Sequence, residues 1–342
     1  MLTSLSTDPT TVRNCLSGKA HFKSRSTWDS IPVEYRRRNH RWFASASLSR
    51  WLITTVACVT TLGAATGLLV YGINDIRGNT LNDALSLGFG AINTAASISA
   101  PLPSIVATVL VANSAQLLLS FLYFAYNSLW TCMLLTEEWA SYARRRNPLR
   151  VTSPIKGQRS TYRLQLPYRY GIPLMVLSGV LHWFVSQSIF LIVLEAYDDN
   201  GYRDENDDIS TCGYSPVAIL TTIITGALVL ALGIANGCRR YKMNGMPLAG
   251  SCSAAISAAC HPPPGDDKPS GKALMWGACR GDGAADWVKS LDLVDRHYSG
   301  EEGATALTND AAIVGHCSFT SFAVERPVEG GLYAGRLPNS KE

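Results

Sequence analysis

Six polar side chains recur along the uncharged stretch between residues 104 and 135, and they have the clearest potential for chemistry in this sequence. They stand three or four positions apart: Asn113, Gln116, Ser120, Tyr123, Asn127 and Thr131. At about 100° per residue, these side chains fall within an arc of roughly 80° on one helix face. Amides in hydrocarbon need hydrogen-bond partners, so we expect this face to point toward other helices or water and not toward lipid.

A second polar face is predicted in the apolar stretch from about Pro173 to Glu195. Ser178, His182 and Ser186 stand four positions apart, which places them on one side of a helix with His182 near the bilayer centre. An ionisable residue inside a membrane is a candidate functional residue, because burial there disfavours its charged form. A neutral imidazole can instead simply donate to an amide on a neighbouring helix. Either way, we predict a contact between His182 and the polar face of residues 113–127.

These two faces form one feature with two interpretations. We define the polar seam as Asn113, Gln116, Ser120, Tyr123, Asn127, Ser178, His182 and Ser186. As packing, each interhelical hydrogen bond would contribute about 0.6–2 kcal/mol. As a pathway, the same groups would line a route for an ion or a ligand. A continuous, water-wide cavity along residues 113–127 would favour transport, whereas a closed, hydrogen-bonded seam would favour a structural role.

Other chemistry has weaker patterns. The acidic run from Glu195 to Asp208 misplaces the glycine of an EF-hand loop and inserts Arg203, so we expect a solvated acidic loop. The cysteines and histidines of the C-terminal third lack C-x-x-C and H-x-x-x-H spacing, so we expect no metal site and no cofactor. The Walker A, G-x-S-x-G and H-E-x-x-H motifs are also absent. We therefore expect no catalytic residues and a protein that is not an enzyme.

Uncharged stretches are expected to supply the helices that position the seam. About 20 helical residues cross about 30 Å of hydrocarbon, and long stretches of this chain have no charge. We predict four membrane spans, near residues 51–73, 104–135, 173–195 and 215–237. The Pro101-Leu102-Pro103 break leaves Ala84–Ala100 as an outer-surface or re-entrant segment. In the first span, Gly63 and Gly67 form a G-x-x-x-G pair where another helix could pack closely.

The charge distribution predicts the orientation of these spans. Residues 1–50 carry nine Lys and Arg against three acids, and residues 136–170 carry eight against two. Basic loops stay in the cytoplasm, so we expect both termini inside and residues 197–214 outside, in the plasma membrane or an endomembrane. Lipid headgroups, not nucleic acid, are the expected partners of these cations. Cys238 precedes Arg239 and Arg240 at a membrane exit, where S-palmitoylation is chemically reasonable.

The sequence thus predicts three parts and an all-α, polytopic membrane fold. Residues 1–50 form a basic cytoplasmic segment, 51–237 the membrane domain and 238–342 a cytoplasmic tail. The tail is rich in Gly, Ala, Ser and Pro and has no sustained amphipathic period, so we predict that it is largely disordered. Cys212 is the only cysteine expected outside, either as a free thiol or bonded to another chain.

Several stretches together resemble a known family. They are VANSAQLLLSFLYFAYNSLWTCML (111–134), SPIKGQRSTYRLQLPYRY (153–170), LMVLSGVLHWFVSQSIFLIVLEAYD (174–198), CGYSPVAI (212–219) and GMPLAGSCSAAISAACHPP (245–263). In this order they are similar to the C-terminal part of a fungal family of multi-pass membrane proteins known only as a domain of unknown function. The resemblance implies membrane location and fungal origin, without an established activity. Members of that family carry a further membrane-embedded N-terminal half, which implies a short form or fragment here and a candidate partner for Cys212.

Two classes of function remain open at this stage. The first is a non-enzymatic scaffold or sensor whose seam is packing, with other membrane helices or the absent N-terminal half as partners. The second is a transporter or channel subunit that uses the polar seam, although no inverted repeat is evident in the sequence.

Overall fold

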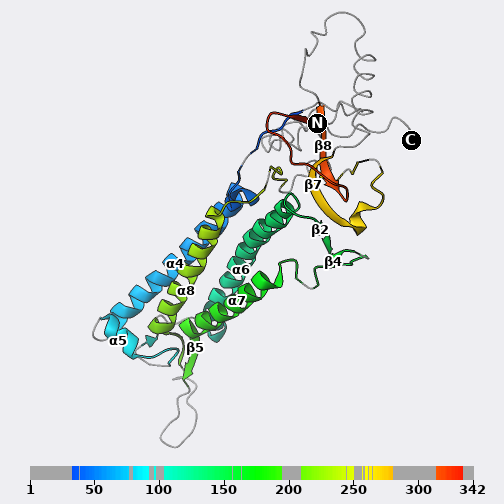
Figure 1. The fold of residues 1–342 in the computed structure, drawn as a ribbon. Coiled ribbons are helices and arrows are strands. Elements are labelled where there is room, and N and C mark those ends of the chain that lie inside the picture. The colour runs from blue at the N-terminus through cyan, green and yellow to red at the C-terminus, as the bar shows by residue number, and fades with distance from the viewer. Residues whose placement is uncertain are drawn as a thin grey trace, which may run out of the picture. The chain divides into compact units, whose positions relative to one another are not determined.

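The chain forms two units, each described by itself. The helical unit comprises Ala46–Thr131 and Leu166–Gly237, and the sheet unit comprises Met1–Ser45, Cys132–Gln165 and Cys238–Glu342. The structure is a computed structural model (Figure 1). It describes residues 33–37, 39–76, 80–91, 96–97, 104–155, 157–162, 164–194, 209–243, 245–249, 256, 259–260, 262–263, 265–279 and 313–333.

The helical unit is built from four long helices (Figure 1). They are α4 (Leu48–Asp75), α6 (Ile105–Ser141), α7 (Tyr168–Ser188) and α8 (Pro216–Cys238), with the last turns of α6 assigned to the sheet unit. Three of them, α4, α6 and α8, are long and apolar enough to cross a membrane. Many of their outward side chains are apolar as well, for example Leu110, Phe124 and Leu228. Outward apolar side chains are suited to lipid, so three of the four predicted spans correspond to membrane-compatible helices.

The third predicted span differs from the expectation. The helix α7 ends at Ser188, and the chain continues as strand β5 (Ile189–Leu194), which pairs antiparallel with β6 (Ile209–Tyr214). The apolar run therefore contains a helix followed by a strand. The residues of β5 are mostly β-branched or aromatic and favour a strand once a partner strand satisfies their backbone groups. The acidic loop between the two strands lies outside the described residues.

The segment between α4 and α6 contains only short structure in its described part. The helix α5 (Leu81–Ser86) is capped by Thr80, whose hydroxyl accepts a hydrogen bond from Asp83 N at 3.2 Å. Ser215 Oγ accepts from Gly90 N at 3.0 Å and donates to Gly88 O at 3.1 Å. These bonds fasten the segment to the N-terminus of α8. Among the described residues of 81–97 there is no helix long enough to cross a membrane.

Tyr214 forms a small core at this end of the helical unit. Its side chain is fully buried and packs with Leu69, Ala96 and Ile219. Its hydroxyl donates to Gly72 O at 3.3 Å. A Cβ at Gly72 would lie 2.5 Å from the Tyr214 ring, so the close approach of α4 and β6 requires glycine there.

The sheet unit contains a five-stranded sheet, so the all-α prediction is wrong. The strand order is β1-β9-β8-β7-β2. The strands are β1 (Val33–Glu34), β9 (Leu332–Tyr333), β8 (Ile313–Thr320), β7 (Ala273–Cys279) and β2 (Asn147–Pro148). The strands β3 (Arg150–Val151) and β4 (Arg159–Ser160) form a separate parallel pair that follows β2 in the chain. The unit also contains η1 (Trp42–Ser45), a short 3-10 helix.

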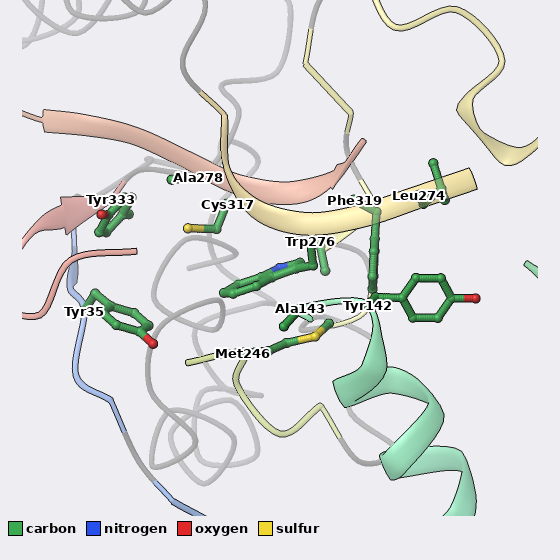
Figure 2. Packing of buried hydrophobic residues seen from close by; sticks show 11 residues of the cluster. Tyr35, Tyr142, Ala143, Met246, Leu274, Trp276, Ala278, Cys317, Phe319 and Tyr333 are labelled. Atoms are coloured by element: carbon green, nitrogen blue, oxygen red, sulfur yellow. The ribbon is translucent and has the colours of Figure 1, made fainter. Parts of the chain in front are cut away.

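The sheet unit has an aromatic core, and described parts of the predicted tail contribute to it. The indole of Trp276 lies at its centre, with Tyr35 and Tyr333 on one side and Tyr142 and Phe319 on the other (Figure 2). Trp276 lies directly opposite Phe319 across β7 and β8. The sequence does not reveal this core, because it joins chain segments that are far apart in sequence, each too short to show a periodic pattern.

Asp266 fixes the end of β8 in the sheet unit. Its buried carboxylate accepts hydrogen bonds from Thr320 Oγ1 at 2.7 Å and from Ser321 N and Oγ at 2.7 and 2.6 Å. Lys272 Nζ lies 3.2 Å away. Burial raises the pKa of this carboxyl, but the hydrogen bonds from Ser321, Thr320 and Lys272 outweigh it and lower the pKa to about 2. The ionised carboxylate therefore has a structural role, in which its hydrogen bonds hold the end of β8.

Candidate functional site

Gln116 of α6 and His182 of α7 are joined by two hydrogen bonds. His182 Nδ1 lies 2.6 Å from Gln116 Oε1, and Gln116 Nε2 donates to the backbone oxygen of His182 at 3.0 Å. The predicted contact between His182 and the polar face of α6 is therefore present. Both side chains are half-buried, as expected for polar groups that find their partners between helices.

The two hydrogen bonds with Gln116 determine which ring nitrogen of a neutral His182 carries the proton. An amide nitrogen can only donate, and the His182 carbonyl can only accept, so the orientation of the Gln116 amide is fixed by the second bond. Its oxygen must then face Nδ1, and an oxygen acceptor requires a proton on Nδ1. The neutral ring consequently carries its lone pair on Nε2.

The other seam residues do not extend this contact into a continuous network. The side chains of Asn113, Ser120 and Ser186 donate to backbone oxygens of their own helices, namely Val109 O, Gln116 O and Trp183 O. Thr131 does the same toward Asn127 O. The seam residues thus share a face as the spacing indicated, but only Gln116 and His182 connect α6 with α7 through a bond between their side chains.

A cavity of about 340 Å³ lies among α4, α6, α7 and α8 in the helical unit. Its wall is largely aliphatic, and it includes Leu62, Leu68, Leu118, Leu122, Leu177 and Leu181. No Asp, Glu, Lys, Arg or His belongs to the wall. A volume of this size is within the range of about 300–1,000 Å³ typical of ligand sites, and such a wall favours uncharged, apolar groups.

The hydroxyl groups around the cavity are mostly engaged. Tyr126 donates to Val229 O at 2.8 Å, and Ser188 Oγ donates to Phe184 O at 2.8 Å and lies 3.1 Å from Thr222 Oγ1. Thr61 donates to Ala57 O at 2.9 Å. Because these groups already have partners, they add little polarity to the space inside.

The cavity and the polar seam occupy different faces of α6. The wall residues of α6 run from Ser114 through Leu118 and Leu122 to Tyr126. At about 100° per residue, the centre of this face lies roughly 130° from that of the seam. The two faces meet at Tyr123, and on α7 Ser178 belongs to both. Asn113, Gln116, Ser120 and Asn127 are not part of the wall, so this cavity does not follow the polar face of residues 113–127.

Glycines allow close helix contacts at positions that the sequence analysis did not select. A Cβ at Gly233 of α8 would lie 2.8 Å from the Tyr126 ring, and one at Gly226 would lie 3.0 Å from Leu62 Cδ2. At Gly63 and Gly67 a Cβ would have no neighbour within 4 Å among the described residues. The G-x-x-x-G pair therefore does not mediate packing among the described helices, while Gly226 and Gly233 do.

Two cysteines from the sequence analysis differ sharply in accessibility. Cys238, the candidate for palmitoylation, is exposed at the end of α8. Cys212 is buried in β6, with its sulfur 3.6 Å from Thr108 O. A bond between Cys212 and another chain would therefore require the hairpin to open.

The comparisons with known proteins concern the family alone. The family described as a domain of unknown function (DUF8419) matches residues 6–333. The chain belongs to this family. The match covers both units, so the helices, the cavity and the sheet all lie inside the region that defines DUF8419. Comparison with curated proteins and with solved structures gave no match.

The seam is evident from the residue spacing in the sequence, whereas the cavity is not. A cavity wall of Leu and Ala has the same composition as a packed helix interface, so no residue type distinguishes it. The one available signal was the number of small side chains in the four helices: Ala64, Ala65, Ser114, Ala115, Ser178 and Gly226. Small residues at facing positions leave space wherever larger neighbours do not fill it.

Proposed function

We propose that this protein is a multi-pass membrane protein that binds an apolar ligand, of the acyl-chain type, and acts without catalysis as a lipid sensor or scaffold. The observation that carries the proposal is the aliphatic cavity of about 340 Å³ inside the helical unit. Burying a charged ligand in such a wall would leave its charge unpaired, which is strongly unfavourable. A hydrocarbon chain would instead gain contacts with the leucines on every side.

The membrane topology is part of the same proposal. The helix α7 has 21 residues and is about 31 Å long, which matches the hydrocarbon thickness. We therefore propose that α7 also spans the membrane, in addition to α4, α6 and α8. Its polar residues lower its overall apolarity, yet Gln116 satisfies His182 within the bundle. With four spans, the basic segments place both termini and residues 136–170 in the cytoplasm. An epitope tag within residues 152–158 should be accessible only after permeabilisation, and labelling of intact cells would refute this topology.

The transporter alternative receives less support. A hydrophilic substrate would need polar groups along its route, but Asn113, Gln116 and Asn127 do not line the cavity. The polar residues that connect α6 and α7 are paired with each other. A closed pair of this kind favours packing as the role of Gln116 and His182.

Photo-crosslinking tests the apolar site directly. The full-length protein in nanodiscs would be mixed with a diazirine-bearing fatty acid, irradiated and analysed by peptide mass spectrometry. Crosslinks should concentrate on the wall positions of α6 and α7, such as Leu118 and Leu181. Ala115→Trp fills the cavity and should reduce this labelling by about tenfold, which corresponds to about 1.4 kcal/mol.

A matched variant on the same helix serves as the control. Leu117 is 60 % exposed and is not part of the wall, so Leu117→Trp adds the same side chain on the outer face. It should leave the labelling of Leu118 and Leu181 unchanged. Uniform labelling of all outward faces, unaffected by Ala115→Trp, would mean that the cavity is not a ligand site.

A further inference from the structure

The segment before α4 and the segment after α8 pair with each other in the sheet unit. Arg41 and Arg240 are antiparallel bridge partners. Trp42 N donates to Arg239 O, and Tyr241 N donates to His40 O, both at 2.9 Å. Two chain segments almost 200 residues apart are thereby held in a fixed register.

Aromatic stacking fixes this pairing from one side. The rings of Trp42 and Tyr241 stack with centroids 5.3 Å apart and an angle of 11°, and both residues are only 3 % exposed. Tyr241 donates through its hydroxyl to Met133 O at 2.9 Å. The Arg239 guanidinium lies 4.6 Å from the Trp42 ring centroid, within cation–π range. The backbone positions of Arg41 and Arg240 are therefore set before any ligand arrives.

This register places two positive charges directly opposite each other. Residues that face each other in an antiparallel pair have Cβ atoms about 4.5–5.5 Å apart, and like charges there are destabilising. Arg41 and Arg240 are both exposed. The ion pairs among the described residues are Arg144–Glu137, Arg150–Glu138 and Lys272–Asp266, and none includes Arg41 or Arg240. The pair thus has an electrostatic cost that an anion between the two guanidinium groups would remove.

The chain position of the pair indicates where such an anion comes from. Arg240 lies two residues beyond Cys238, the last residue of α8. Arg41 precedes η1, which leads into α4 at Leu48. Both arginines are thus close in sequence to the ends of helices that are apolar enough to cross a membrane. A tryptophan and a tyrosine beside them are the residues that prefer the headgroup level of a bilayer.

We propose that Arg41 and Arg240 together bind the phosphomonoester of an anionic lipid headgroup. A phosphomonoester carries about −1.5 to −2 charge at neutral pH, which matches two guanidinium groups. Guanidinium forms paired hydrogen bonds with phosphate oxygens, so each arginine can engage two of them. This site is separate from the apolar cavity of the helical unit and does not depend on a ligand there.

Lipid titration of the full-length protein in neutral detergent tests the site. The probes are dioctanoyl phosphatidic acid, dioctanoyl phosphatidylcholine and inorganic phosphate, followed by ligand-induced thermal stabilisation. Phosphatidic acid should stabilise the wild-type protein, and R41Q/R240Q should weaken its binding by at least about tenfold. Phosphatidylcholine and inorganic phosphate should bind far more weakly, because one lacks net charge and the other lacks the lipid part.

Two further variants separate this site from general attraction and from misfolding. R145Q/K268Q removes two exposed cations from the same unit and should change the affinity for phosphatidic acid by less than about twofold. Without lipid, R41Q/R240Q should unfold at the same temperature as the wild type or higher, because it relieves the repulsion. Equal weakening by R145Q/K268Q, or inorganic phosphate binding as tight as phosphatidic acid, would overturn the proposal. Loss of thermal stability in lipid-free R41Q/R240Q would overturn it as well.

Discussion

Gln116 and His182 hold α6 and α7 together through a pair of reciprocal hydrogen bonds. The side-chain oxygen of Gln116 faces His182 Nδ1 at 2.6 Å, and its nitrogen donates to the His182 backbone at 3.0 Å. One side chain thereby satisfies two groups of the other helix, which makes this contact the polar connection between α6 and α7.

Removing this connection should destabilise the protein. Gln116→Leu leaves His182 Nδ1 and its carbonyl without their partner, so we expect a loss of about 1–2 kcal/mol in the free energy of unfolding. Denaturation of the purified protein in mixed micelles measures this value. The effect of Gln116→Leu combined with His182→Ala should be smaller than the sum of the single changes, because both remove the same contact.

Asn113→Leu is the matched control on the same helix. The Asn113 amide is exposed and donates to Val109 O of its own helix, so its loss should change stability by less than about 0.5 kcal/mol. His182→Asn keeps a donor near Nδ1 and should retain more stability than His182→Ala. Equal losses for Asn113→Leu and Gln116→Leu would contradict a specific role for the Gln116–His182 pair.

The effect of a glycine substitution on stability should differ between a position where two helices touch and a position on an open helix face. Gly233→Ala forces a Cβ to within 2.8 Å of the Tyr126 ring, and we expect destabilisation of about 1–3 kcal/mol. Gly63→Ala meets no described neighbour within 4 Å and should stabilise α4 by about 0.5–1 kcal/mol. Thermal unfolding of both variants tests the pair. Destabilisation by Gly63→Ala would instead indicate that another helix packs on this face in the membrane.

Asp266 should make the sheet unit sensitive to acid. The pKa of its carboxyl is lowered from 3.8 to about 2, so its stabilising effect is fully present above about pH 4 and is lost as the pH falls toward 2. The shift corresponds to about 2 kcal/mol for this buried group. Asp266→Asn should therefore lose about this amount at pH 7, and the difference from the wild type should shrink between pH 4 and pH 2.

The neighbouring Asp267 supplies the control for this pH dependence. Its side chain is exposed, so Asp267→Asn should have little effect on stability at pH 7. Urea denaturation followed by tryptophan fluorescence measures both variants, since Trp139 and Trp276 report on the core of this unit. A pH-independent difference between Asp266→Asn and the wild type would show that the carboxylate is not the group that titrates.

The cysteines should react in the order of their accessibility. Cys238 is exposed and should be labelled early by a maleimide in the folded protein, well before Cys317. Cys317 is buried and burial raises its pKa, so the reactive thiolate is scarce and labelling should require unfolding. Peptide mass spectrometry over time measures the order. Rapid labelling of Cys317 without denaturant would mean that the core around Trp276 opens readily.

The sequence by itself determined the positions of three helices that are long and apolar enough to cross a membrane. Charge-free runs of sufficient length can be accommodated only in a bilayer or a large core, and α4, α6 and α8 follow the predicted spans closely. The i, i+4 spacing also predicted the contact of His182, because a polar residue in an apolar helix must find a partner and few were available. These are local arguments, in which composition and period decide the outcome.

Only the tertiary structure decided where the apolar runs change from helix to strand and where space remains between helices. The strand β5 has the same apolar composition as a helix end, and only its pairing with β6 distinguishes the two. The core around Trp276 joins Tyr35, Tyr142 and Phe319 from distant parts of the chain, so no single window contains its pattern. The cavity and the Arg41–Arg240 pair arise in the same way, because packing and register are properties of several segments together.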